Sequence, residues 1–316
     1  MIDKKVVVVA TGGTIAMKYD KEKHGLVPAC SGKDLADAVP GLGDIAPLEF
    51  VQFSNIASPG MTPQNMWDLH CKIEELLARD DVAGVVVTHG TDTLEETSFF
   101  LDITAKSQKP VVCTAAMRGA SDISPDGPYN IYCSLKTAAS PQAVGMGVMV
   151  CLDEILQAPG EVMKTHSANP ATFQSPWWGP IGYVDIDHIV WRRKVLGVKR
   201  FHPQALTARV DFAVNQGVKG IVIEGFGRGN VPPAMVPGIA DAIKKGIAVI
   251  LTTRTPGGRV LDVYGYPGSV TDTRSVGIAA AGEISAAKAR LKLMVVLSEH
   301  PEYATQRDKL EEIFDI

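Results

Sequence analysis

Two short segments carry side chains that could perform chemistry, and each directly follows an apolar run. The first reads Thr-Gly-Gly-Thr at residues 11–14, after the run at residues 6–10. Its two glycines allow a sharp turn and would present the Thr14 hydroxyl as a nucleophile at the end of a strand. A glycine-rich turn of this kind could equally bind phosphate or serve only to reverse the chain. The segment alone therefore leaves these alternatives open.

The second segment reads Thr-His-Gly-Thr-Asp-Thr at residues 88–93. Its last residue, Thr93, forms a capping-box pattern with Glu96, which predicts a helix beginning directly after Thr93. Thr91 and Asp92 would then lie in the turn before this helix. Helix capping is the alternative explanation for Thr and Asp here. A carboxylate beside two hydroxyl groups would instead recognise an ammonium group or polarise a base.

A threonine hydroxyl is a poor nucleophile and needs a neighbouring base. A lysine can provide one where burial disfavours its charge, and Lys164 is the candidate. A lone lysine is more often a solvated surface residue, so Lys164 is a hypothesis at this point. His89 is predicted to be a buried structural histidine, and Trp177 and Trp178 to pack in the core or at an interface.

Alternating patterns predict the elements that must position these side chains. Apolar, β-branched runs alternate with stretches of helical periodicity, which predicts a parallel sheet covered by helices. These runs occupy residues 6–10, 82–87, 110–113 and 144–152. Thr62-Pro63 predicts a helix start, with apolar residues on one face of the helix that follows. Ligands of such sheets bind beside the turns that follow the strands, where both segments lie.

The predicted fold is α/β, with a larger N-terminal parallel-sheet domain at residues 1–192 and a smaller C-terminal α/β domain at residues 193–316. The stretch at residues 153–193 is rich in Pro, Gly and aromatic residues and predicts irregular strands or hairpins that end the first domain. A helix is predicted in the second domain at residues 236–245. Strands are predicted there at residues 195–198, 220–224, 248–251 and 292–297.

The composition excludes several function classes. The chain has 316 residues and a net charge of −4, which gives no electrostatic reason to expect nucleic acid or an anionic membrane as a partner. No apolar run approaches the 18 residues of a spanning helix. Five scattered cysteines lack the spacing of a metal site or disulfide framework and predict buried thiols in the cytoplasm.

The two segments, taken in order, resemble the paired signatures of bacterial-type L-asparaginases and the related glutaminase-asparaginases. The first signature is Thr-Gly-Gly-Thr-Ile-Ala from residue 11, and the second continues from residue 88 as Leu-Glu-Glu-Thr at residues 94–97. The resemblance extends to Ala-Met-Arg at residues 116–118, Asp-Gly-Pro-Tyr-Asn at residues 126–130, Gly-Pro-Ile-Gly at residues 179–182, Gly-Arg-Gly-Asn at residues 227–230 and Lys-Ala-Arg at residues 288–290. It therefore covers nearly the whole chain.

The resemblance implies hydrolysis of L-asparagine to L-aspartate and ammonia through an acyl-enzyme on Thr14. Thr91, Lys164 and Asp92 would be the supporting hydroxyl, base and acid. Ser58 would contact the substrate α-carboxylate, and Asp92 would also pair with the α-ammonium. In addition, Ala116 would supply a main-chain contact near the leaving amide.

The resemblance also implies a homo-oligomer, either a dimer of subunits that share active sites or a tetramer. Asn230 would contribute to the site of a partner subunit. Neither a metal nor an organic cofactor is implied. Pro59 stands where secreted members commonly have glutamine, so the preference between asparagine and glutamine stays open. Tyr19 and Asp272 are the candidates for the lid tyrosine and the interface acid of those enzymes.

Two rival functions remain to be distinguished. One is release of ammonia for transfer to glutamyl-tRNA, a role that usually comes with an extra N-terminal domain. The other is a non-catalytic amino-acid sensor that binds asparagine without turning it over. The acidic charge disfavours the first, and the presence of Thr14, Thr91 and Lys164 disfavours the second.

Overall fold

A computed structural model describes residues 3–13, 17–20, 25–28, 41–186, 188–195, 217–282, 284 and 286–314. The chain divides into two compact units. The first consists of Met1–Tyr19, Val27–Lys164 and Asn169–Ala205, and the second of Asp20–Leu26, Thr165–Ala168 and Leu206–Ile316. Both units are α/β, as predicted. The predicted boundary at residue 193 stays a prediction, because residues 196–216 lie outside the described ranges.

The first unit is built on an eight-stranded sheet with the order β12-β11-β8-β7-β6-β5-β1-β4. Its parallel strands are β1 (Lys5–Gly12), β4 (Leu48–Ile56), β5 (Val82–Thr88), β6 (Val111–Thr114) and β7 (Val148–Leu152). Its antiparallel strands are β8 (Ile155–Gln157), β11 (Gly182–Asp185) and β12 (His188–Trp191). Two short pairs lie outside this sheet, β2 (Met17–Asp20) with β3 (Gly25–Pro28) and β9 (Met163–Lys164) with β10 (Phe173–Gln174).

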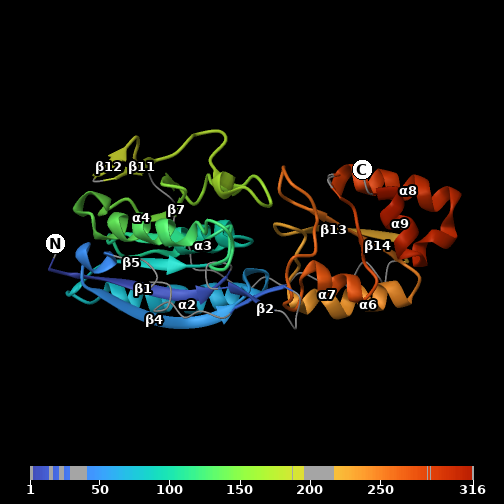
Figure 1. The fold of residues 1–316 in the computed structure, drawn as a ribbon, viewed down its shortest axis with the longest axis horizontal. Helices are drawn as coiled ribbons and strands as arrows, with labels where there is room; N and C mark the ends of the chain where they lie inside the picture. Colours follow the sequence, from blue (N-terminus) through green and yellow to red (C-terminus); the bar gives the residue numbers. More distant parts are fainter. Residues whose placement is uncertain are drawn as a thin grey trace. The chain divides into compact units, whose positions relative to one another are not determined.

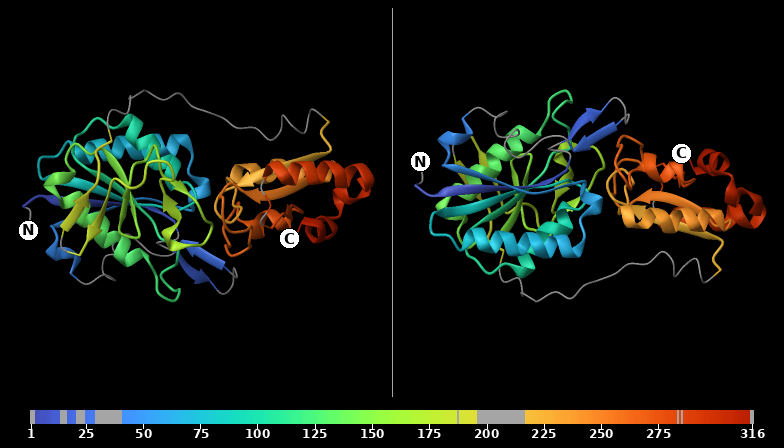
Figure 2. Two further views of the ribbon diagram at one scale, coloured as in Figure 1. Left: turned by 90° about the horizontal axis from the view of Figure 1, so that it is seen from above. Right: turned by 90° about the horizontal axis from the view of Figure 1, so that it is seen from below.

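Helices cover both faces of this sheet (Figures 1 and 2). Side chains of a strand alternate between faces, so Val7 and Val9 pack with α2 (Pro63–Leu77) and α3 (Leu94–Thr104), whereas Val6 and Val8 pack with α4 (Gly127–Ala139). The predicted helix start after Thr62 is confirmed, because the Thr62 hydroxyl accepts a hydrogen bond from the Asn65 N–H.

The second unit holds a three-stranded parallel sheet in the order β13-β14-β15. The strands are β13 (Gly220–Gly225), β14 (Ala248–Thr253) and β15 (Ala279–Ala280). Helices α6 (Val236–Lys244) and α7 (Val270–Ser275) belong to one hydrophobic cluster, and α8 (Ala286–Glu299) and α9 (Arg307–Phe314) to the other. Short 3₁₀ helices occur in the two units at Leu42–Asp44, Ser58–Gly60, Pro141–Ala143, Pro170–Thr172, Pro233–Met235 and Pro301–Thr305.

Two predicted strands need correction. The strand predicted at residues 292–297 is wrong, because these residues lie in α8. Its packed residues Ala289, Leu293, Val296 and Leu297 follow the four, seven and eight residue spacing of a helix. The strand predicted at residues 144–152 begins only at residue 148, since both Gly145 and Gly147 have positive φ values. Residues 196–198 of the strand predicted at 195–198 lie outside the described ranges.

Candidate active site

The strand order of the first unit reverses at β1. β4 pairs with one side of β1, and β5 pairs with the other. In an open α/β sheet, ligands bind at such a reversal of strand order. Ala10 of β1 pairs with Thr88 of β5, which pairs with Thr114 of β6. The turns that follow these three strands therefore lie at one edge of the sheet, as the sequence predicted for the first two.

The backbones of these turns approach one another closely. Gly13 has a φ of 85°, and a Cβ atom at this position would lie 2.2 Å from the main-chain nitrogen of Gly90. A Cβ atom at Gly90 would lie 2.6 Å from the Ser58 Oγ. Only glycine fits at either position. The predicted nucleophile, Thr14, directly follows this packed turn and lies outside the described residues.

Lys164 is buried at this edge, which overturns the surface alternative for this residue. Its Nζ donates to Thr91 Oγ1 at 2.8 Å and to Asp92 Oδ1 at 2.7 Å. Lys164, Thr91 and Asp92 are each 4–5% exposed. Hydrogen bonds are strengthened in a water-poor environment, and these two hold the three groups in a fixed arrangement. The structure thus brings Lys164 to Thr91 and Asp92, which lie 73 and 72 positions earlier in the sequence.

Glu95 fixes the main chain of Lys164 and was not identified from the sequence. Its Oε2 accepts a hydrogen bond from the Lys164 main-chain N–H at 2.6 Å. Lys164 also pairs with Phe173 across the β9–β10 ladder. Both ends of the lysine side chain are thereby held, the tip by Thr91 and Asp92 and the backbone by Glu95. The only signal in the sequence was a glutamate at the second position of α3, which does not indicate a contact with Lys164.

Ser58 connects a third turn to the cluster. Its Oγ accepts a hydrogen bond from the Asp92 N–H at 3.2 Å, and its carbonyl accepts one from the Thr93 hydroxyl at 2.7 Å. The helix α3 begins at Leu94 as predicted, but the predicted capping box is wrong, because the Thr93 side chain makes no capping hydrogen bond. The Thr93 hydroxyl joins two turns instead of capping the helix.

His89 is a structural histidine, as predicted. It is fully buried, with Nδ1 2.8 Å from the Gly90 carbonyl oxygen and Nε2 3.1 Å from the Thr97 hydroxyl. Because a carbonyl can only accept, we assign the proton to Nδ1, and the Thr97 hydroxyl then donates to Nε2. Burial lowers the pKa of His89 to about 4, so the imidazole is neutral at pH 7.

The remaining predicted site residues lie in two places. Ala116 is fully buried in the turn after β6, at the same edge as the cluster. Asn230 belongs to the second unit, at the end of a loop that is closed by main-chain hydrogen bonds between Phe226 and Asn230. Its side chain is fully buried in the single chain. The predicted contact of Asn230 with a partner subunit stays a prediction.

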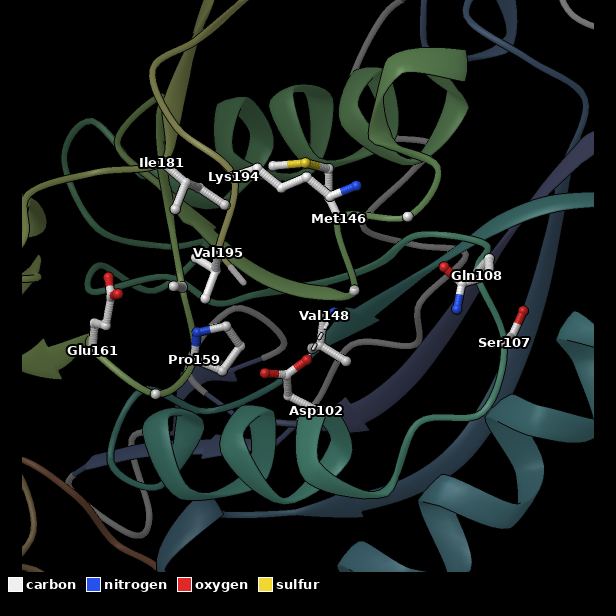
Figure 3. A pocket seen from close by; sticks show the side chains of 14 residues that line it. Asp102, Ser107, Gln108, Met146, Val148, Pro159, Glu161, Ile181, Lys194 and Val195 are labelled. Atoms are coloured by element: carbon white, nitrogen blue, oxygen red, sulfur yellow. Dashed lines mark hydrogen bonds between the residues drawn. The ribbon is translucent and has the colours of Figure 1, made fainter. Parts of the chain in front are cut away.

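A separate cavity of about 270 Å³ lies at the opposite, amino-terminal ends of β6 and β7 (Figure 3). Asp102, near the end of α3, points towards Pro159 and Val148 in this cavity. Neither Lys164 nor Thr91 lines it. Within the described ranges, no group of three or more His, Cys, Asp or Glu side chains is placed to hold a metal ion.

Two predictions about side-chain burial are wrong in part. Trp177 is 88% exposed and Trp178 is 71% exposed, so neither packs in the core, and a role at an interface stays a prediction. The free cysteines Cys113, Cys133 and Cys151 are buried as predicted, whereas Cys71 is exposed. Cys30 lies outside the described residues. Among the helices that the structure describes, none is long and apolar enough to cross a membrane.

The fold and the buried cluster define a two-unit α/β protein whose site is suited to acid–base chemistry on a hydroxyl group. Family models match the chain in two consecutive parts. Residues 5–196 match the N-terminal asparaginase domain, and residues 196–314 match the glutaminase/asparaginase C-terminal domain. The chain therefore belongs to the asparaginase/glutaminase family.

Individual relatives span nearly the whole chain. An L-asparaginase from Bacillus licheniformis is 33% identical, with 95% of this chain and 98% of the relative covered. A glutaminase-asparaginase from Pseudomonas fluorescens biotype A is 31% identical, with coverage of 93% and 86%. The crystal structure of a probable cytoplasmic L-asparaginase from Campylobacter jejuni is 31% identical, with a TM-score of 0.58 and coverage of 98% and 99%.

Proposed function

We propose that this protein hydrolyses L-asparagine to L-aspartate and ammonia through a threonyl acyl-enzyme on Thr14. The observation that carries the proposal is the buried contact of the Lys164 amine with Thr91 and Asp92, at the edge where the Gly13 turn also lies. The names of the relatives support the choice of substrate. Slower hydrolysis of L-glutamine is part of the proposal.

In the first half-reaction, the Thr14 oxygen attacks the side-chain amide carbon, and the hydroxyl proton passes to the base group formed by Thr91 and Lys164. The tetrahedral intermediate then collapses, the C–N bond breaks, and the leaving nitrogen takes up that proton to depart as ammonia. Asp92 accepts a hydrogen bond from Lys164 and compensates the positive charge on its amine. General-base assistance of this kind contributes about 10²- to 10⁴-fold to the rate.

In the second half-reaction, water attacks the ester carbon of the acyl-enzyme. The same base group takes the proton of the water, and the Thr14 oxygen leaves and is protonated again. Aspartate is then released, and the site returns to its starting state. Each step uses only side chains of the protein, asparagine and water, and we propose no metal and no organic cofactor.

Substrate recognition is assigned to the groups that surround the cluster. Since the Ser58 Oγ accepts from the Asp92 N–H, its own hydroxyl proton can be donated to the substrate α-carboxylate. The Asp92 carboxylate would also pair with the α-ammonium. We propose that Ala116 contacts the amide through its main chain. How much slower glutamine is hydrolysed than asparagine is left to measurement, because Pro59 stands where secreted members commonly have glutamine.

We also propose a homo-oligomer in which Asn230 completes the site of a partner subunit, as a dimer or a tetramer. The support is the family membership of both units of the chain. Light scattering on the purified protein tests the assembly. A monomer that is fully active at assay concentration would contradict it.

A cytoplasmic location is a further part of the proposal. It is supported by the similarity to a relative described as cytoplasmic and by three buried free cysteines. Fractionation of cells that express the native gene tests it. Recovery of the protein from the medium or periplasm would contradict the assignment.

The decisive experiment measures ammonia release from L-asparagine and L-glutamine in parallel, for the wild type and Thr14→Ala. We expect asparagine turnover in the wild type and a loss of at least about 10⁴-fold in the variant, because removal of a nucleophile abolishes the covalent route. Mass spectrometry after an acid quench should detect an adduct on Thr14. A folded wild type that releases no ammonia from either amide would overturn the proposed activity.

A further inference from the structure

The turn that contains Ala116 is held by two side chains to which no role has yet been given. Asp126 accepts hydrogen bonds from the main-chain N–H groups of Met117, at 3.0 Å, and Arg118, at 2.9 Å. The side-chain amide of Asn130 donates to the Ala115 carbonyl at 2.9 Å. The same amide donates to Asp126 at 3.1 Å, so the two side chains act as one connected group.

These contacts determine the direction of both polar main-chain groups of Ala116. The described peptide bonds are all trans, and in a planar trans peptide the C=O and N–H point in opposite directions. The Met117 N–H points at Asp126, so the Ala116 carbonyl points away from that carboxylate. The Ala115 carbonyl points at Asn130, so the Ala116 N–H points away from that amide. Asp126 therefore sets the direction of the Ala116 carbonyl, and Asn130 sets the direction of the Ala116 N–H.

Two observations favour a role in positioning over a role in folding. Asp126 occupies the N-cap position of α4, yet its side chain makes no capping hydrogen bond to that helix. An N-cap aspartate usually accepts from the first turn of its own helix, and here the carboxylate serves a different turn. Ala116 is fully buried, and its main-chain groups form no hydrogen bond within the part of the chain that the structure describes.

Buried main-chain groups are nearly always paired. A pair of them that is aimed by neighbouring side chains and has no protein partner in the described ranges fits a ligand. The turn lies beside the Thr88 turn, because the His89 N–H donates to the Thr114 carbonyl at 2.8 Å. This places the aimed groups of Ala116 at the edge that holds Lys164.

We propose that Asp126 and Asn130 are positioning residues that aim the main chain of Ala116 at the reacting amide of the substrate. The inference rests on the proposed function. The Ala116 carbonyl would accept a hydrogen bond from the amide NH₂ group and hold the amide carbon in line with the nucleophile. A small misalignment of reacting groups costs rate more than affinity. Loss of either side chain should therefore lower kcat and leave KM close to that of the wild type.

Asp122 provides a matched control in the same loop. Its carboxylate accepts a hydrogen bond from the Gly119 N–H at 2.8 Å, so it also anchors a main-chain N–H group, but one beyond Ala116 and Met117. The variants to compare are Asp126→Asn and Asp122→Asn. Asp126→Ser is added because serine is a favoured N-cap residue, which preserves the start of α4, while its hydroxyl is too short to reach Met117.

The experiment measures kcat and KM for L-asparagine in these variants, together with amide hydrogen exchange of the peptide that contains residues 115–118. We expect kcat to fall by about 10²-fold in both Asp126 variants, with KM changed by less than about threefold. Exchange of the peptide should rise in the Asp126 variants and stay unchanged in Asp122→Asn, which should keep wild-type kinetics.

The outcomes separate the inference from the function on which it rests. An active wild type with undiminished kcat in both Asp126 variants overturns the inference. So does an equal loss in Asp122→Asn, or a loss confined to KM. A wild type that folds but releases no ammonia overturns the proposed function instead, and the exchange data then still report whether Asp126 holds the turn.

Discussion

The two edges of the parallel sheet in the first unit differ in how their polar side chains are arranged. At the carboxyl edge, Lys164 and Asp92 are buried and joined by a hydrogen bond. At the amino edge, the two acidic groups around the cavity have separate partners. Asp102 accepts from the Val148 N–H, and Glu161 is paired with Arg193.

The candidate site is therefore indicated by the convergence of polar side chains and not by open volume. The amino edge holds a cavity of about 270 Å³ but no nucleophile beside a base among its lining residues. The carboxyl edge holds three hydrogen-bonded groups that can exchange a proton. The backbone shows the same contrast. The structure leaves no room for a Cβ atom at Gly90 but has room for one at Gly160.

The sharpest test of the difference between the two edges replaces one lysine at each edge by methionine. Lys164→Met should lower kcat by about 10²- to 10⁴-fold, because it removes the group that accepts the proton. Lys194→Met, at the amino-edge cavity, should keep wild-type kinetics, because Lys194 is exposed there. Steady-state ammonia release measures both, after circular dichroism has shown that each variant is folded. Equal losses in the two variants would remove the distinction between the edges.

Glycine substitutions test the packing difference and should have a smaller effect. A Cβ atom at Gly90 would lie 2.6 Å from Ser58 Oγ and 2.7 Å from Ser58 Cβ, so Gly90→Ala should cost about 1–3 kcal/mol in the free energy of unfolding. A Cβ atom at Gly160 would lie 3.7 Å from the Phe99 ring, an ordinary contact, so Gly160→Ala should change stability by less than about 0.5 kcal/mol. Urea denaturation measures both. A Gly90→Ala protein as stable as Gly160→Ala would contradict the close approach of the turns.

The sequence predicted the carboxyl edge well because the pattern there is local. The strands that end at Gly12 and Thr88 are apolar and β-branched, and each is followed at once by its polar turn. The apolar face of α2 was equally clear, since its buried residues repeat at helical spacing. Where the spacing of apolar residues and the residues of the adjoining turn indicate the same structure, the helix or strand can be predicted from the sequence alone.

Contacts between distant segments could not be predicted in the same way. Glu95 holds a main-chain nitrogen 69 residues away, and the Thr93 hydroxyl bonds to the Ser58 carbonyl instead of capping its helix. The strand β4 was missed because its residues are only partly buried at the edge of the sheet. In α8, an apolar β-branched run suggested a strand, and the helical spacing of its packed residues decided otherwise. Tertiary packing overrides local propensity in each case.

The smallest predicted effect concerns the pH dependence of stability and the buried histidine at the carboxyl edge. The pKa of His89 is lowered by burial from 6.5 to about 4, so between these values the unfolded chain binds a proton that the folded protein does not. This contribution to stability is fully present above pH 6.5 and is lost as the pH falls towards 4. Between pH 7 and pH 5.5 the free energy of unfolding should therefore decrease by about 1 kcal/mol on account of His89.

The variant His89→Gln should remove this decrease, as measured by urea denaturation at several pH values. Burial also lowers the pKa of His70, which contributes in the same direction and is retained in the variant, so a weaker pH dependence should remain. The control is His188→Gln, which removes an exposed imidazole from β12 at the far side of the same sheet. A pH dependence that is unchanged in His89→Gln, or reduced equally in His188→Gln, would contradict the assignment of a neutral, buried imidazole at His89.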